Sequence, residues 1–219
     1  MIAHLDLGIA DYAETLTLQR RLHARRCAGE IGDVLLSVEH PPVLTLGRSG
    51  SREHVLVPPA TLREHGIEIH EIERGGDITY HGPGQLVMYP ILDLRAYGKD
   101  VHRFVWTLEE GILRALAACG IEAARRAGYP GVWVGERKIA SLGVYVKHWV
   151  SYHGIAVNVA VNPEHFALIR PCGLPVETVS VNDLRSGPIE LSDVRDPLIE
   201  ALEALWATEI ASVDRQELI

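Results

Sequence analysis

The sequence predicts a mixed α/β fold in a single domain. Hydrophobic patterns with helical spacing alternate along the chain with short apolar runs typical of strands, and no repeat, low-complexity tract or long linker interrupts them. Of the 219 residues, 47% are hydrophobic and 23% are charged, which is ordinary for a globular protein. A chain of this length can bury a sizeable core. We therefore expect one domain over residues 1–219, with a C-terminal helical segment over residues 190–219.

The first expected elements are a helix and two strands. A helix is expected over residues 12–27, because Asp11 and Glu14 have the spacing of an N-terminal capping box and Gly29 follows the far end. Apolar runs at residues 34–38 and 43–46 predict two strands separated by a Pro-Pro break.

The clearest helical pattern lies in the middle of the chain. Seven apolar residues from Val101 to Cys119 recur at helical spacing, with Asp100 as a candidate N-cap and Gly120 as a candidate terminator. Further strands are expected near residues 86–92, 132–134, 138–146 and 154–159.

The C-terminal segment predicts another helix. Asp196 can serve as its N-cap, with Pro197 at the first helical position, where a missing N–H costs nothing. Leu198, Leu202, Leu205 and Trp206 then form an apolar stripe. We expect this helix to cover the core and to carry no chemistry.

Composition excludes several classes of protein. The net charge of −8 argues against general nucleic-acid binding, and no apolar run is long enough to predict a membrane span. The N-terminus lacks the pattern of a secretory signal. Cys27, Cys119 and Cys172 are odd in number, widely spaced and without a C-x-x-C pair, so free thiols and a cytoplasmic location are expected.

The densest chemical signal is the segment 74–85. It holds four glycines and one proline in twelve residues, together with Arg, Thr, Tyr, His and Gln, and a strand pattern follows at once. Glycines let a backbone adopt positive φ angles and approach a ligand closely. A glycine-rich turn is the simpler interpretation, but the polar residues among the glycines favour a binding loop.

Two further segments carry candidate reactive groups. Lys138 opens an apolar strand, where by itself a solvated edge lysine would be the expected role. Cys172 lies between a proline and a glycine, on a constrained turn that can expose a nucleophile. The other two cysteines lie in helical patterns, and Cys119 falls on an apolar face, as a buried structural cysteine does.

Taken together with residues 153–158, these three segments resemble the four signatures of the lipoyl(octanoyl) transferase family, without a departure at the key positions. The resemblance covers about residues 74–173. It implies the α/β fold of the lipoate and biotin protein ligase catalytic domains. It also implies an acyltransferase catalytic domain that moves octanoyl from acyl carrier protein to a lysine of lipoyl domains, a step of lipoate biosynthesis. The related ligases activate the acid with ATP and lack the Pro-Cys-Gly nucleophile, so Cys172 favours the transferase and no cofactor is expected.

The resemblance also implies roles for individual residues. Cys172 would become acylated, and Lys138 would be its acid/base partner. The acceptors would be lipoyl domains of 2-oxoacid dehydrogenase E2 subunits and the glycine cleavage H protein. The acyl site would be lined by Arg74, Gly75, Gly76, Asp77, Ile78, Thr79, Tyr80, His81, Ser141, Leu142, Gly143, Gly154, Ile155 and Ala156.

These residue types suit the reaction. A free thiol has a pKa of ~8.5, and a nearby ammonium stabilises the reactive thiolate. Exchange between thioesters is close to isoenergetic, and attack by an amine on the second thioester is strongly downhill, so no ATP is needed.

Alternatives to the transferase remain open. Cys172 paired with His81 or His153 would make a Cys–His hydrolase, and a non-catalytic acyl-binding or lipoyl-domain-binding module is also possible. A metal site is not expected, because no histidine pair has zinc-like spacing with a third ligand nearby.

Overall fold

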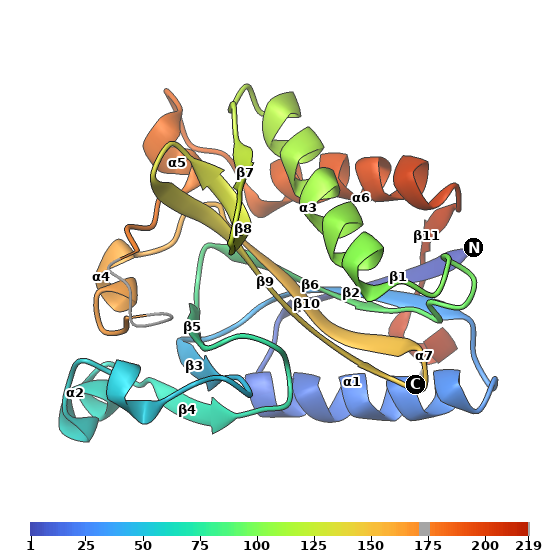
Figure 1. Ribbon diagram of the computed structural model, residues 1–219, viewed down its shortest axis with the longest axis horizontal. Coiled ribbons are helices and arrows are strands. Elements are labelled where there is room, and N and C mark those ends of the chain that lie inside the picture. The colour runs from blue at the N-terminus through green and yellow to red at the C-terminus, as the bar shows by residue number, and fades with distance from the viewer. Residues whose placement is uncertain (171–175, 219) are drawn as a thin grey trace.

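A large mixed sheet with helices on both faces and a smaller sheet beside it make up the computed structural model (Figure 1), which describes residues 1–170 and 176–218. The strands are β1 (Ile2–Ile9), β2 (Asp33–Glu39), β3 (Val43–Leu46), β4 (Glu68–Glu71), β5 (Ile78–His81), β6 (Gln85–Ile91), β7 (Ala124–Arg126), β8 (Tyr129–Val134), β9 (Arg137–Lys147), β10 (Val150–Asn158) and β11 (Ile210–Ser212). The helices are α1 (Tyr12–Cys27), α2 (Pro59–Glu64), α3 (Val101–Ala118), α4 (Pro163–Phe166), α5 (Val181–Leu184), α6 (Leu191–Trp206) and α7 (Arg215–Leu218), with a 3₁₀ turn at Arg52–His54.

The large sheet has the strand order β11-β1-β2-β6-β10-β9-β8-β7, and the small sheet has the order β4-β3-β5. In the large sheet, β1 runs parallel to β11 and β2, and every other neighbouring pair is antiparallel. The register places Gly154 of β10 opposite Gly143 of β9. On the other side of β10, Ile155 lies opposite Met88 of β6. These pairings bring the sequence motifs of residues 138–143 and 153–158 side by side.

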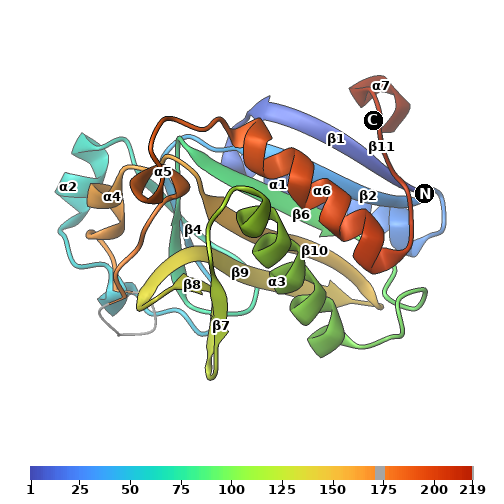
Figure 2. The same cartoon turned by 90° about the horizontal axis from the view of Figure 1, so that it is seen from above.

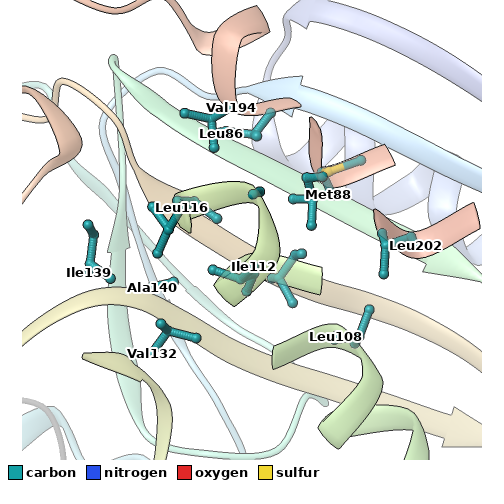
Figure 3. Close-up of a cluster of buried hydrophobic side chains, with 14 of the residues drawn as sticks. Leu86, Met88, Leu108, Ile112, Leu116, Val132, Ile139, Ala140, Val194 and Leu202 are labelled. Atoms are coloured by element: carbon teal, nitrogen blue, oxygen red, sulfur yellow. The ribbon is translucent and has the colours of Figure 1, made fainter. Parts of the chain in front are cut away.

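Helices α3 and α6 cover one face of the large sheet, and α1 covers the other (Figures 1 and 2). Strand β6 is buried on both faces, because Leu86 and Met88 pack under α3 and α6 while Val87 and Tyr89 belong to the cluster around α1. Figure 3 shows the first cluster, in which Leu108, Ile112 and Leu116 of α3 point at the sheet. Each fully buried Leu or Ile contributes about 1.5–3 kcal/mol to folding, so this layer anchors the central strands rigidly.

Local capping signals set the ends of α1 and α3 as predicted. The Asp11 carboxylate accepts a hydrogen bond from the Glu14 N–H at 2.9 Å, and α1 spans the expected residues. Asp100 accepts hydrogen bonds from the first backbone N–H groups of α3. Gly120 adopts a φ of 75° just after that helix, a left-handed conformation that glycine tolerates without strain.

The expected start of the C-terminal helix at Pro197 is wrong. Helix α6 begins at Leu191, because Glu190 and Asp193 form a reciprocal capping box upstream. Pro197 therefore lies inside the helix and cannot donate a hydrogen bond to the carbonyl of Asp193, four residues earlier. The Cys119 thiol lies 3.5 Å from that carbonyl oxygen and takes the place of the missing N–H, which makes the helical proline tolerable.

Among the described residues, no helix has the length and apolar character needed to cross a membrane.

Candidate active site

A cavity of about 440 Å³ lies where the glycine-rich segment meets β9 and β10. It collects nearly all of the sequence-predicted site residues. Those that line it are Arg74, Gly75, Gly76, Asp77, Ile78, Thr79, His81, Lys138, Ser141, Leu142, Gly143, Gly154, Ile155 and Ala156.

Among the predicted site residues that the structure describes, Tyr80 is the one that does not line the cavity. The segment expected to be one continuous loop contains strand β5, and alternation along that strand sends Tyr80 to the face opposite Thr79 and His81. Its hydroxyl lies 2.7 Å from His165 Nδ1, and its ring packs edge-on against Phe166. Tyr80 therefore packs on the face of the small sheet that points away from the cavity.

Backbone hydrogen bonds clamp the glycine-rich loop on two sides. Arg48 N–H donates to the Arg74 carbonyl at 3.0 Å on the β3 side, and Gly75 N–H donates to the Val144 carbonyl of β9 at 3.0 Å. The buried Arg74 guanidinium donates to the Thr45 carbonyl at 2.7 Å and to its hydroxyl at 2.8 Å. Arg74 thus fixes the loop to β3 while its side chain lines the cavity.

At two motif positions neighbouring backbone or side-chain atoms approach so closely that only glycine fits. A Cβ on Gly143 would lie 2.8 Å from Arg74 Cδ and 3.0 Å from the Gly75 carbonyl oxygen. A Cβ on Gly154 would lie 2.1 Å from the Met88 carbonyl oxygen, well inside van der Waals contact. These glycines let the loop close over β9 and let β10 pair closely with β6.

Lys138 is the second residue of β9 and is half-buried in the cavity wall. Its backbone N–H donates to the Glu177 carbonyl at 2.8 Å, and the Val179 N–H donates to the Lys138 carbonyl at 3.0 Å. The ammonium nitrogen lies 5.4 Å from the centroid of the Trp133 ring. The absent side chain of Gly131 leaves the space for the lysine, because a Cβ there would lie 2.5 Å from Lys138 Cε.

Cys172 lies outside the described residues. The chain on both sides of residues 171–175 is held in place. Arg170 N–H donates to the His54 carbonyl at 2.8 Å, and Val176 and Thr178 line the cavity.

The two motif histidines are buried and neutral. Burial lowers the pKa of His81 to about 3 and that of His153 to about 3. His153 adopts a left-handed φ of 55°, and its N–H turns to the Gln19 side-chain oxygen at 2.9 Å. Within the described part of the chain, no three His, Cys, Asp or Glu residues are grouped so that they could hold a metal ion.

A model of the lipoyl protein ligase A/B catalytic domain family matches residues 11–203 of the chain. The chain belongs to this family. An octanoyltransferase of Caldicellulosiruptor saccharolyticus is 43% identical over 97% of this chain and 92% of its own length. An octanoyltransferase of Syntrophobacter fumaroxidans is 45% identical over 92% of this chain and 89% of its own length. The predicted relationship to the octanoyltransferases, and with it the acyltransferase class, is confirmed.

Solved structures with a similar fold confirm the predicted fold. The lipoate complex of P. falciparum LipL1 has a TM-score of 0.77 at 12% identity, covering 100% of this chain and 68% of that one. A biotin protein ligase from Aquifex aeolicus has a TM-score of 0.55 at 10% identity, covering 94% of this chain and 69% of that one. At such low identity the similarity concerns the fold alone.

The cavity wall also contains residues that the motifs did not indicate. Most are apolar or aromatic, and they come from α1, β6, α3, the β7–β8 hairpin, β9, α4 and the segment after residue 175. Strand periodicity alone could have predicted that Val87 and Tyr89 share one face of a strand. It could not have predicted that they lie beside the cavity. The additional lining residues are Tyr12, Val87, Tyr89, Val105, Gly128, Tyr129, Pro130, Trp133, Val144, Phe166, Val176 and Thr178.

Proposed function

We propose that this chain transfers an octanoyl group from octanoyl-acyl carrier protein to a lysine of lipoyl domains through a thioester on Cys172. The observation that carries the proposal is the cavity itself, which is rich in apolar side chains and has Lys138 in its wall. The backbone of Lys138 pairs with residues 177–179, and the segment that contains Cys172 ends just before them. The cavity, Lys138 and the residues that follow the Cys172 segment therefore lie together, which supports the proposal.

The cavity suits a medium-length acyl chain. Its volume of about 440 Å³ lies in the range of small-molecule sites. Burying about six methylenes at ~0.8 kcal/mol each would supply roughly 5 kcal/mol of binding free energy. Ile155 and Ala156 on β10 and Leu142 on β9 offer apolar surface for that chain.

The proposed chemistry proceeds in two steps. The Cys172 thiolate attacks the carbonyl of the donor thioester, the bond to the carrier sulfur breaks, and the departing sulfur takes a proton from the Lys138 ammonium. The neutral acceptor amine then attacks the new thioester. A C–N bond forms, the amine passes one proton to Lys138, and the Cys172 thiolate is released. Bonds and protons balance without ATP or another cofactor.

Partners and location follow from the same chemistry. The donor is octanoyl-acyl carrier protein, and the acceptors are lipoyl domains of 2-oxoacid dehydrogenase E2 subunits and the glycine cleavage H protein. One structurally similar protein, a bipartite lipoate protein ligase from Thermoplasma acidophilum, was analysed with its E2 lipoyl domain. A reaction that depends on a free thiol suits the reducing conditions of the cytoplasm.

Burial of the motif histidines disfavours a Cys–His hydrolase. A histidine that activates a thiol must take up the thiol proton and become charged, but burial disfavours the charged imidazole and lowers the pKa of both His81 and His153 to about 3. His81 also uses Nδ1 to contact Gln85 at 2.7 Å. Lys138 is the better partner for the thiolate.

Mass spectrometry of the protein incubated with octanoyl-acyl carrier protein tests the proposal. We expect an octanoyl adduct on Cys172 that persists until a lipoyl domain is added. A hydrolase would release free octanoate without an acceptor, and a binding module would show neither adduct nor product. Cys172→Ser should remove the adduct and all transfer, whereas Cys27→Ser and Cys119→Ala should retain the adduct. Full transfer by Cys172→Ser would overturn the covalent mechanism.

A further inference from the structure

A chain of side-chain hydrogen bonds runs from the cavity to the backbone beside Lys138. His81 Nδ1 lies 2.7 Å from Gln85 Oε1, and Gln85 Nε2 donates to Asn158 Oδ1 at 3.0 Å. Asn158 Nδ2 in turn donates to the Val179 carbonyl at 3.3 Å. Gln85 and Asn158 are direct partners in the pairing of β6 with β10, so the register of the central sheet places the two amides together.

The two backbone carbonyls that end this series of hydrogen bonds determine which atoms in it donate and which accept. The carbonyls of Tyr80 and Val179 can only accept, so Gln85 Nε2, which lies 3.2 Å from the Tyr80 oxygen, and Asn158 Nδ2 must donate. Gln85 Oε1 is then an acceptor, and the proton of His81 must reside on Nδ1. The other ring nitrogen, Nε2, is left with a lone pair, and it has no hydrogen-bond partner among the described residues.

Every side chain in this series of hydrogen bonds is held by its surroundings. Gln85, Asn158 and His81 are all buried, so water does not compete for their hydrogen bonds. Val179 also donates its N–H to the Lys138 carbonyl at 3.0 Å, which connects the chain to the backbone of the lysine. The imidazole of His81 lines the same cavity as Lys138.

We propose that Gln85 and Asn158 are positioning residues that hold His81 in the Nδ1–H tautomer, so that Nε2 accepts a hydrogen bond from the amine that attacks the acyl thioester. This inference rests on the proposed function. A primary amine carries two N–H groups. One loses its proton to Lys138 during attack, and the other remains in the amide product and donates to His81 Nε2 throughout. His81 thereby orients the amine lone pair towards the carbonyl without itself taking a proton.

The role predicts a split between the two half-reactions. The network acts only on the amine that attacks in the second half-reaction. Gln85→Met should therefore leave the rate of Cys172 acylation from a small octanoyl thioester within about 2-fold of wild type. Transfer from the preformed acyl-enzyme to a lipoyl domain should fall about tenfold, the factor that corresponds to one lost hydrogen bond. Asn158→Leu should show the same split. Ser37→Ala is the matched control, because it removes a buried 2.9 Å hydrogen bond to His4 away from the cavity, and it should change neither half-reaction.

A direct readout of the tautomer completes the test. Histidine ¹⁵N shifts of the full-length protein, with His81 assigned by His81→Gln, should show Nδ1 protonated in the wild type and a change of tautomer in Gln85→Met. Protonation of Nε2 in the wild type would overturn the inference. So would an equal fall of both half-reactions in Gln85→Met and Asn158→Leu, because that outcome indicates a structural role. If wild-type protein forms no acyl-enzyme, the proposed function fails, and the NMR result still decides whether the network sets the tautomer.

Discussion

Gly154→Ala tests how closely the two central strands of the site approach each other. The added Cβ would lie 2.1 Å from the Met88 carbonyl oxygen and 2.7 Å from Pro90 Cδ. Relief requires a shift of about 1 Å between β10 and β6, each of which is hydrogen-bonded along its length to another strand. Overpacking of this kind costs about 1–3 kcal/mol, and the upper end applies here because the clash is with backbone.

Two other glycines serve as controls, because they separate the cost of this clash from the other effects of replacing glycine by alanine. A Cβ on Gly32 would meet no other atom within 4 Å, and the φ of Gly32 is not left-handed, so Gly32→Ala should be neutral or stabilise by about 0.4–1 kcal/mol. Gly120 has equal space but a φ of 75°, so Gly120→Ala should cost about 1 kcal/mol from backbone strain alone. Urea unfolding followed by tryptophan fluorescence ranks the three variants. A Gly154→Ala protein as stable as Gly32→Ala would refute the close approach of β10 and β6.

Two further predictions concern charge. Lys138→Ala should slow both half-reactions, and Lys138→Arg should restore little, because arginine keeps its proton; an unchanged apparent pKa of Cys172 towards a thiol reagent in Lys138→Ala would exclude activation by the lysine. Burial tends to raise the pKa of Glu73, but hydrogen bonds from Arg20 and Tyr152 outweigh it and lower that pKa to about 2. The ionised carboxylate therefore stabilises the fold above the unfolded-state pKa of about 4.3, and this contribution is lost as the pH falls towards 2. The stability gap between wild type and Glu73→Gln should close over that pH range, and a gap independent of pH would contradict the assignment.

Local sequence signals were sufficient for helices α1 and α3 and for the motif residues that line the cavity. Caps act within a few residues, so Asp11 and Asp100 could be recognised without a structure. The true start of α6 was missed because the Asp196-Pro197 pair imitates a helix start, and only the tertiary contact from Cys119 explains how the helix tolerates the proline.

Non-local pairing accounts for the other differences. The glycine-rich segment contains a short strand because it pairs with β3, which lies far earlier in the sequence, and that pairing turns Tyr80 away from the cavity. The contact between Gln85 and Asn158 likewise depends on strand register, and a register shift by one residue would send each amide to the opposite face. No periodicity within either strand contains that information.

The motif glycines and the hydrogen-bond network contribute to the site in different ways. Gly143 and Gly154 bring loop and strands into close backbone contact, which creates a cavity whose walls are held by the sheet. A cavity held in this way can exclude water, and exclusion of water keeps the His81 imidazole neutral. Strand packing and acid–base chemistry at this site are therefore coupled, and a substitution that loosens β10 from β6 should reduce transfer before it unfolds the protein.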